Sequence, residues 1–496
     1  MTKPFQTLSR RWFLGALLAS AAPGALAQPL TRSLRPAPRP EDRFRAAEAD
    51  QLIARAGLGG KLGYVVADAR TGQALEVHNP LLGLPPASVA KAVTAVYALE
   101  TLGAGHRFVT RVIATGPLRN GRLEGDLVLV GGGDPTLDTD MLGELAGQLK
   151  AAGLHEVTGR FLYHAGALPD LPAIDPDQPD HVGYNPAISG LNLNFNRVHF
   201  EWHRAAGGYD VTMDARAARF SPRVSVAQMQ VVDRAAPVYT YSSKGGVDEW
   251  TVAEGALGKE GARWLPVRRP ALYCAEVFQT LIRAHGIVLP APLPASAPPQ
   301  GVVLAQHQSE PLAEILREML KYSTNMTAEA VGLSATIARG QTPAGLPASA
   351  RAMTDWLATR MGVPRAHLVD HSGLGPASRV SAREMVRVLV AVGPDGPLKP
   401  LLKSIPMRDA QGRPVPGHPV QVRAKTGTLN FVSGLAGYIT TGSGRELAFA
   451  IFSADQARRD AVAPQDLERP PGGRTWVAHA RRLQQDLVAR WAEIYG

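Results

Sequence analysis

The chain is poor in cysteine, which limits its covalent framework. Cys274 is the only cysteine among 496 residues, so no intramolecular disulfide can form even in an oxidising compartment. We expect Cys274 to be a small buried apolar residue. Runs that interleave basic and aromatic residues are also missing, and the composition therefore gives no indication of nucleic-acid binding.

Long apolar runs are scarce as well, and the one near the N-terminus has the form of an export signal. Residues 13–22 are too few to span a bilayer, and they follow the twin arginine Arg10-Arg11. An Ala-x-Ala sequence that ends at Ala27 provides a cleavage site. This pattern predicts a twin-arginine signal peptide over 1–27, removed after Ala27, with the mature chain in the periplasm and at most peripherally associated with the membrane.

Lysine is scarce compared with arginine, since only ten of the 53 basic residues are lysines. The formal net charge of +10 would suit an anionic surface such as a cell wall, but the arginines are scattered, which favours a bias of composition. Two of the ten lysines, Lys91 and Lys425, nevertheless fall in short motifs. Arginine stays charged at any workable pH, so a requirement for a proton acceptor explains why Lys91 is not an arginine.

Three short motifs occur once each and in this order: Ser88-Val-Ala-Lys91, Ser323-Thr-Asn325 and Lys425-Thr-Gly427. Any one of them arises by chance in many proteins. Together they supply a nucleophile, a base, a proton relay and an anion clamp. That is the set required by serine enzymes that attack D-alanyl peptides or penicillins.

The first motif predicts a nucleophile and its base at the start of a helix. Positions i and i+3 of a helix share a face, so Ser88 and Lys91 can meet. Burial among Val89, Ala90 and Val93 would disfavour the charged ammonium and lower the pKa of the lysine. Free N–H groups at the helix start could bind an oxyanion. From this motif alone, a serine helix cap followed by a solvent-facing lysine is the alternative.

The other two motifs predict a proton relay and a substrate clamp. Ser323 could pass a proton between the base and a leaving amine, and Asn325 could hold both a lysine and a substrate amide. Lys425, on a strand edge, could bind a carboxylate. Gly427 admits the substrate backbone, and the N–H of Thr428 could complete an oxyanion hole with that of the nucleophile. Taken singly, these motifs also fit a helix terminator and an edge-strand lysine that discourages aggregation.

Hydrophobic patterns divide the chain into an outer and an inner part. We expect helices over 41–56, 89–102 and 475–494 and from 311 onward, and strands over 61–69, 74–78, 420–428, 434–440 and 446–453. The two ends would share one sheet in a catalytic domain of 41–110 and 306–496. Short strands and glycine-rich turns over 111–305 predict a β-rich insertion, either undivided or with a nested domain at about 184–240. Residues 28–40, rich in proline, predict a linker.

Two other patterns do not carry chemistry. His199 and His203 alternate with apolar residues, which predicts a strand in which the two imidazoles lie roughly 13 Å apart, too far to share a metal ion. The Gly131-Gly-Gly133 run is not followed by the lysine and hydroxyl of a phosphate-binding loop. We therefore predict neither a metal nor a cofactor.

With these motifs the chain resembles the penicillin-binding proteins and serine β-lactamases. More narrowly, it is similar to the class C low-molecular-mass D-alanyl-D-alanine carboxypeptidase/endopeptidases, peptidase family S13. The sequence from Pro86 to Ala95 resembles that family's nucleophile helix, and the sequence from Gly125 to Pro135 its insertion signature. The long gap between the first and second motifs fits the large insertion of this group.

The resemblance implies an α/β (α+β) fold. A penicillin-recognising serine transpeptidase-like domain, with an antiparallel sheet, helices on both faces and a helical subdomain, would carry the β-rich insertion. One loop departs from the family pattern. Asp370-His-Ser-Gly-Leu-Gly stands where the family has Asp-Gly-Ser-Gly-Leu-Ser, and the differences at His371 and Gly375 leave the detailed role of this loop open.

The resemblance also implies catalytic roles. Ser88 would form the acyl-enzyme, Lys91 would accept its proton and Ser323 would relay protons. Whether Lys91 or another group is the acylation base stays open.

Substrate binding would fall to the remaining motif residues. Asn325 would position the substrate. Lys425, Thr426 and Thr428 would hold its terminal carboxylate. The oxyanion hole would use the backbone of Ser88 and Thr428.

The sequence thus predicts a periplasmic serine-type D-Ala-D-Ala carboxypeptidase/endopeptidase. Its expected partners are peptidoglycan stem peptides and cross-links as substrates and β-lactams as covalent inhibitors, with no nucleic acid, and its oligomeric state is open. The alternatives are a β-lactamase, for which no motif supplies a deacylating base, and a penicillin sensor or wall-binding scaffold that is acylated without turnover. The complete set of serines and lysines favours turnover.

Overall fold

The computed structural model describes residues 40–409 and 411–496. The predicted signal peptide, 1–27, lies outside the described residues, as does the predicted linker, 28–40, apart from Pro40. The chain divides into two compact units: Met1–Glu48, in which α1 (Pro40–Ala56) begins, and Ala49–Gly496, which holds all the described strands and every later helix. In the described part of the chain, no helix is both long and apolar enough to cross a membrane.

A six-stranded antiparallel sheet, in the order β19-β20-β21-β22-β1-β2, joins strands from the two ends of the chain. Its strands are β1 (Lys61–Asp68), β2 (Ala74–His78), β19 (Lys403–Ile405), β20 (Gln421–Leu429), β21 (Val432–Thr440) and β22 (Glu446–Ala454). β1 pairs with β22 along its whole length, from Lys61 opposite Ala454 to Asp68 opposite Leu447. This confirms the prediction that both ends of the chain form one sheet.

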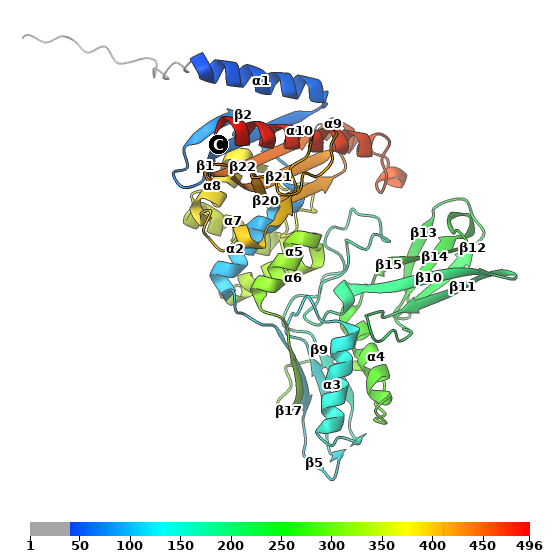
Figure 1. The fold of residues 1–496 in the computed structure, drawn as a ribbon. Coiled ribbons are helices and arrows are strands. Elements are labelled where there is room, and N and C mark those ends of the chain that lie inside the picture. Colours follow the sequence, from blue (N-terminus) through cyan, green and yellow to red (C-terminus); the bar gives the residue numbers. More distant parts are fainter. Residues whose placement is uncertain (1–39, 410) are drawn as a thin grey trace, which may run out of the picture. The chain divides into compact units, whose positions relative to one another are not determined.

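Helices cover both faces of this sheet (Figure 1). One face packs against α10 (Gly473–Ile494), whose Leu483, Leu487 and Trp491 are buried. The opposite face packs against a group of helices: α2 (Ala90–Leu102), α5 (Leu312–Tyr322), α6 (Asn325–Ala338), α7 (Leu346–Met361) and α8 (Ala382–Val392). α2 is buried along most of its length, as its apolar composition predicted.

Residues 109–308 build a second core. A five-stranded sheet has the order β16-β9-β7-β4-β17, with β4 (Val109–Ala114), β7 (Leu127–Val130), β9 (Phe161–His164), β16 (Leu293–Pro294) and β17 (Val302–Gln308). Two helices, α3 (Thr139–Ala151) and α4 (Pro270–Arg283), contribute apolar residues to the same core. Cys274, on α4, is buried there, as predicted.

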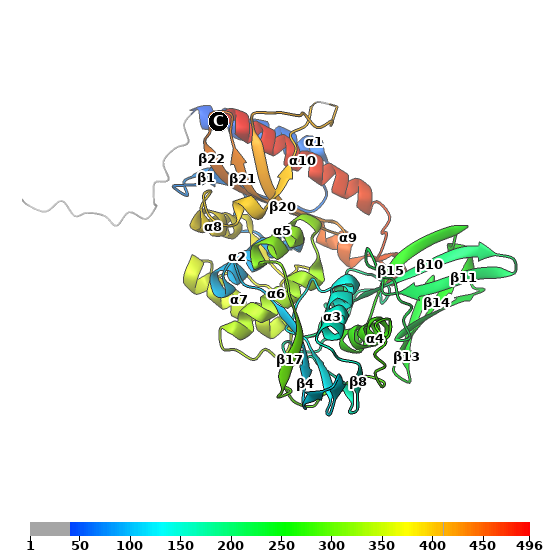
Figure 2. The ribbon, with the colours of Figure 1, turned by 60° about the horizontal axis from the view of Figure 1, so that its bottom comes forward.

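Two three-stranded sheets adjoin this core and lie against each other (Figures 1 and 2). They are β11-β10-β15, with β10 (Arg197–Ala205), β11 (Gly208–Asp214) and β15 (Glu260–Pro266), and β12-β14-β13, with β12 (Ala227–Val232), β13 (Tyr239–Lys244) and β14 (Val247–Ala253). His199 and His203 lie on β10, which confirms the predicted strand. The paired sheets continue past residue 240 to Pro266.

Short elements complete the described fold. They are β3 (Gly83–Leu84), paired with β18 (Val380–Ser381), the small sheet of β5 (Leu118–Arg119), β6 (Arg122–Leu123) and β8 (Glu156–Val157), and the helix α9 (Gln456–Asp460).

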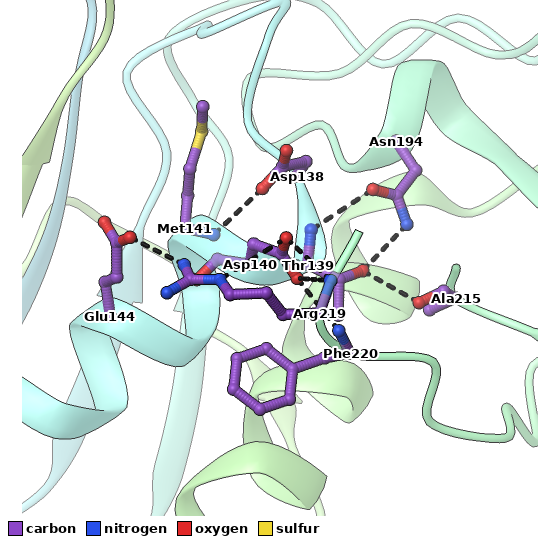
Figure 3. Close-up of polar contacts among 9 residues, drawn as sticks. All are labelled: Asp138, Thr139, Asp140, Met141, Glu144, Asn194, Ala215, Arg219 and Phe220. Atoms are coloured by element: carbon purple, nitrogen blue, oxygen red, sulfur yellow. Dashed lines mark hydrogen bonds and ion pairs between the residues drawn. The ribbon is translucent and has the colours of Figure 1, made fainter. Parts of the chain in front are cut away.

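The start of α3 ties distant segments of the second core together (Figure 3). The carboxylate of Asp140 accepts the backbone N–H groups of Arg219 and Phe220 at 3.0 Å each. On the other side of the helix start, Asn194 Nδ2 donates to Thr139 Oγ1 at 2.8 Å. Side chains of one helical turn thus anchor a loop without regular structure, which includes Arg219 and Phe220, and the 3-10 turn Asn194–Asn196.

Candidate active site

Ser88 lies in a single 3-10 turn, Ala87–Val89, that leads directly into α2. Ala87, immediately before it, has a φ of 47°, a left-handed conformation that is uncommon for a residue with a side chain. Gly373 lies so close that a Cβ on it would be 1.9 Å from the Ala87 carbonyl oxygen. Strained turns that are held by their surroundings cluster at functional sites, which fits a nucleophile at this position.

The side chain of Lys91 is fully buried and reaches three partners. Its Nζ donates to Ser88 Oγ at 3.0 Å, to Asn325 Oδ1 at 2.7 Å and to the carbonyl oxygen of Ser372 at 2.8 Å. The predicted contact between Ser88 and Lys91 is therefore present, and the first two motifs meet at this amine. A solvent-facing lysine, the alternative interpretation of the first motif, is excluded.

Burial sets the protonation of Lys91. It lowers the pKa because the charged ammonium loses its hydration. The buried carboxylates of Glu329 and Asp370 act in the opposite direction through their negative charge. The net direction is downward, so the neutral amine is more accessible than for a lysine in water and can accept the proton of Ser88.

The same two carboxylates hold the loop 370–375 against Lys91. Glu329 accepts the N–H groups of His371 at 2.9 Å and Ser372 at 2.8 Å. Asp370 accepts the N–H groups of two glycines inside the loop at 2.7 and 2.6 Å. Glu329 is absent from the site residues predicted above. The signal that could have found it is its place as the lone acid of the otherwise apolar helix α6.

Both departures of this loop from the family pattern are matched by local packing. His371 is buried, its Nε2 lies 2.7 Å from Ser349 Oγ, and a Cβ on Gly332 would come within 2.1 Å of its ring. Burial lowers the pKa of His371 to about 3, so the ring is neutral near pH 7. A Cβ on Gly375 would lie 2.6 Å from Val369 Cγ2, so a larger residue would displace the loop. The loop therefore keeps its contact with Lys91 despite both differences.

The second motif lies at the break between α5 and α6, as its polar sequence predicted. Ser323 has a φ of 62°, and its Oγ accepts a hydrogen bond from Lys425 Nζ at 2.9 Å. Asn325 begins α6, and its Nδ2 donates to the backbone oxygen of Tyr184 at 2.9 Å. Tyr184 belongs to the segment between β9 and β10 and is a further site residue that the sequence did not indicate. A contact made by a backbone oxygen leaves no pattern in the side chains.

Lys425 lies on β20 where that strand becomes an edge. β19 pairs with β20 only as far as Ala424, so within the described chain no strand covers the outer edge from Lys425 to Leu429. The free strand edge that was predicted at Lys425 is thus limited to the part of β20 from Lys425 to Leu429. Lys425 is 1% exposed, and burial together with the charges of Lys91 and Lys403 lowers its pKa to about 6.

The strand runs tightly past the nucleophile turn. A Cβ on Gly427 would lie 2.6 Å from the Pro86 oxygen and 3.1 Å from the Ser88 nitrogen, which requires glycine at this position. This close approach brings the backbone around Gly427 next to the N–H of Ser88. It is the geometry that an oxyanion hole built from Ser88 and Thr428 would need.

A cavity of about 950 Å³ opens over the nucleophile. Its wall includes Ser88, Ser323, Asn325 and Thr428, the side chains and backbone that a bound peptide would meet. The amine of Lys91 lies behind this wall, in contact with the nucleophile but buried. Among the described residues, no group of three or more His, Cys, Asp or Glu side chains is placed to hold a metal ion.

Known proteins are similar to this chain in sequence. The profile of the D-Ala-D-Ala carboxypeptidase 3 (S13) family matches residues 45–469. A D-alanyl-D-alanine carboxypeptidase from Actinomadura sp. (strain R39) is 29% identical over 458 residues, which cover 84% of this chain and 82% of that protein. A carboxypeptidase from Mycobacterium tuberculosis is 30% identical over 406 residues, which cover 79% of this chain and 76% of that protein.

The fold agrees with the sequence relatives. A crystal structure of penicillin binding protein 4 from Haemophilus influenzae superposes with a TM-score of 0.71 at 23% identity, covering 89% of this chain and 99% of that chain. The mixed α/β architecture with several sheets is therefore that of penicillin binding protein 4, and the resemblance drawn from the three motifs is confirmed. The chain belongs to the S13 family and is a serine-type D-alanyl-D-alanine carboxypeptidase.

Proposed function

We propose that Ser88 attacks the carbonyl carbon of the D-Ala-D-Ala bond and forms an acyl-enzyme. As Ser88 Oγ bonds to that carbon, its proton passes to the neutral amine of Lys91. The observation that carries this proposal is the 3.0 Å contact between Lys91 Nζ and Ser88 Oγ inside a buried site. The N–H groups of Ser88 and Thr428 would stabilise the negative oxygen that develops on the carbonyl.

The leaving group is the amine of the terminal D-Ala, which needs a proton as the bond breaks. Ser323 would give its hydroxyl proton to that amine and be reprotonated from the lysines. The support is the contact between Lys425 Nζ and Ser323 Oγ at 2.9 Å. Asn325, which accepts from Lys91 at 2.7 Å, would hold the substrate amide.

Hydrolysis of the acyl-enzyme would then release the shortened stem peptide. A water molecule attacks the ester carbonyl, Lys91 accepts its proton, and Ser88 regains its hydroxyl hydrogen as the ester bond breaks. Cross-linked peptides contain the same kind of D-Ala amide bond, with a neighbouring stem peptide as the leaving amine. We therefore extend the proposal to endopeptidase activity on cross-links, which the open, 950 Å³ cavity would admit.

β-Lactams should acylate the same serine. A structure of the Haemophilus influenzae relative has been determined in complex with a β-lactam. In this chain, the cyclic amide of a β-lactam would present its carbonyl carbon to Ser88 and the same N–H groups. Covalent labelling by a fluorescent penicillin is the corresponding expectation.

The organisation of the chain supports a further part of the proposal. Residues 111–305 would form an insertion in the catalytic domain of 41–110 and 306–496, because their apolar residues make a core separate from those on either side of the six-stranded sheet. The two sheets of 197–266 would be its nested part. The N-terminal twin arginine and cleavage site support export of the folded protein to the periplasm.

The test is incubation of the purified protein with purified muropeptides, followed by mass spectrometry of the products. We expect loss of the terminal D-Ala from monomeric pentapeptides and conversion of cross-linked dimers to monomers. Ser88→Ala should abolish both reactions, while Ser404→Ala, an exposed serine on β19, should leave them unchanged. Acylation by penicillin without release of either product would contradict the proposal and favour a sensor.

A further inference from the structure

The residues of the third motif point to opposite faces of β20. Side chains alternate along a strand, so Lys425 shares one face with Gly427, and Thr428 lies on the other. On its own face, Lys425 Nζ donates to Ser323 Oγ at 2.9 Å and to the Thr426 carbonyl oxygen at 2.8 Å. Two of its three possible hydrogen bonds are thus made inside the protein. Lys425 is therefore poorly placed to meet a carboxylate bound beside Thr428.

Arg481, on α10, occupies the face of Thr428. Its Nη2 donates to Thr428 Oγ1 at 3.1 Å, and it lines the same cavity as Ser88. Arg481 is exposed and makes no ion pair with any described residue. A guanidinium has five N–H donors, so most of them are available to a ligand in the cavity.

The packing of α10 fixes Arg481 at this point. Thr428 pairs across the strands with Ser433, and Gln484, one turn after Arg481, donates to Ser433 Oγ at 3.0 Å. The helix therefore contacts both members of one cross-strand pair, through two polar side chains. Leu483 lies between Arg481 and Gln484 in the sequence, and its burial against the sheet fixes the position of the helix.

The charge of the surrounding wall also favours an anion. Four arginines line the cavity: Arg459, Arg469, Arg474 and Arg481. Only two acids, Asp460 and Glu468, line it as well. Glu468 is already paired with His181 at 2.9 Å and with Arg263 at 3.0 Å. Its charge is therefore partly neutralised by residues outside the arginine group.

We infer that Arg481, together with the hydroxyl of Thr428, binds the terminal carboxylate of the substrate and makes the enzyme selective for peptides that end in a free acid. A guanidinium can bind a carboxylate through two parallel hydrogen bonds, which a buried lysine cannot do. Lys425 is then the electrostatic partner of Ser323, not the carboxylate clamp. This inference rests on the proposed acyl-enzyme mechanism at Ser88.

The test compares two substrates on each variant. One is an N-acyl-D-alanyl thioester whose leaving group is mercaptoacetate, which carries a free carboxylate, and the other is the same thioester with that carboxylate methylated. Arg481→Ala should lower kcat/KM for the acid by about 10- to 100-fold, the range of a charge-assisted hydrogen bond. Its kcat/KM for the methyl ester should change by less than about 2-fold, because the ester has no anion to lose.

Arg482→Ala is the matched control, since it removes the same charge from the next position of the same helix, where the side chain is exposed and does not line the cavity. It should leave the acid-to-ester ratio unchanged. The ratio within one variant is insensitive to partial misfolding, because both substrates report the same folded fraction. An unchanged ratio in Arg481→Ala would overturn the inference, whereas a wild type that hydrolyses neither thioester would overturn the proposed function itself.

Discussion

The two main cores of the molecule differ in whether they bury lysine. Within residues 109–308 they anchor the chain: Asn194 contacts Thr139, and Asp140 accepts two backbone N–H groups. In the catalytic part, the buried Lys91 and Lys425 instead donate to serine hydroxyls. The described residues of 109–308 include no buried lysine.

The difference is one of free energy. A neutral amide that finds its hydrogen-bond partners stabilises the fold at every pH, whereas a buried ammonium costs free energy unless it loses its proton. The part of the chain around Ser88 carries that cost, and also the left-handed backbone of Ala87, and the proposed reaction would use both the neutral amine and the tight turn. In the second core, left-handed backbone occurs at Asn120, Asn194 and Asn196, a residue type that tolerates it, and also at Phe195.

The largest effect that tests this difference between the two cores is expected at Lys91. Lys91→Arg keeps a positive charge but cannot accept the Ser88 proton, so acylation should slow by about 10²- to 10⁴-fold, as for loss of a general base. The measurement is the rate of covalent labelling by a fluorescent penicillin. Lys150→Arg, an exposed lysine on α3, is the control and should label at the normal rate. Near-normal labelling of Lys91→Arg would show that this lysine is only structural.

The corresponding substitution in the second core is Asn194→Ala. It removes the contacts with Thr139 and with the hydroxyl of Tyr273 at 3.2 Å, and should lower the free energy of unfolding by about 2–4 kcal/mol. Urea denaturation measures the loss, while the labelling rate of the folded protein should not change. Asn120→Ala isolates the backbone effect, because Asn120 is exposed and has a similar φ of 51°. Equal losses in the two variants would mean that the hydrogen bonds contribute nothing.

A pH series tests the cost of burying Lys425. The folded pKa of Lys425 is about 6, against 10.5 for an ordinary lysine, so between these values the unfolded chain binds one more proton than the folded chain. The free energy of unfolding should therefore rise with pH in this window, by up to about 1.4 kcal/mol per unit, and be lost as pH falls toward 6. Lys425→Met should flatten this dependence, while Lys244→Met, at an exposed lysine on β13, should retain it. Parallel curves for wild type and Lys425→Met would show that the lysine is charged in the folded protein.

The smallest effect is expected at the surface of the second core. Arg219 pairs with Glu144 at 2.7 Å, and both side chains are about half exposed (Figure 3). Arg219→Ala leaves the backbone N–H that Asp140 accepts, and should cost less than about 1 kcal/mol in thermal or urea denaturation. A loss as large as that of Asn194→Ala would mean that this exposed ion pair stabilises the protein as much as the buried contacts of Asn194 do.

Much of the architecture is visible in local patterns. The strands β21 and β22 follow from short apolar runs, which are buried on both faces. The apolar face of α10 follows from side-chain periodicity, and the break before Asn325 follows from a polar turn between two helices. The contact of Lys91 with Ser88 follows from their spacing in the chain. The role of Glu329 was not predicted because it lies one turn beyond the second motif on α6 and acts on backbone N–H groups of a loop 42 residues away.

The amino-acid sequence by itself determined which residues could do the chemistry, because spacing along a helix and the choice of lysine over arginine are local properties. Tertiary structure alone decided what each lysine contacts. Lys425 was predicted to clamp a carboxylate, and only the folded chain shows that its amine also contacts Ser323, a residue 102 positions away. Arg481 lies beside Thr428 only because α10, more than fifty residues later, packs across the same strand pair. Contacts of that kind depend on how whole elements pack, which no short stretch of sequence encodes.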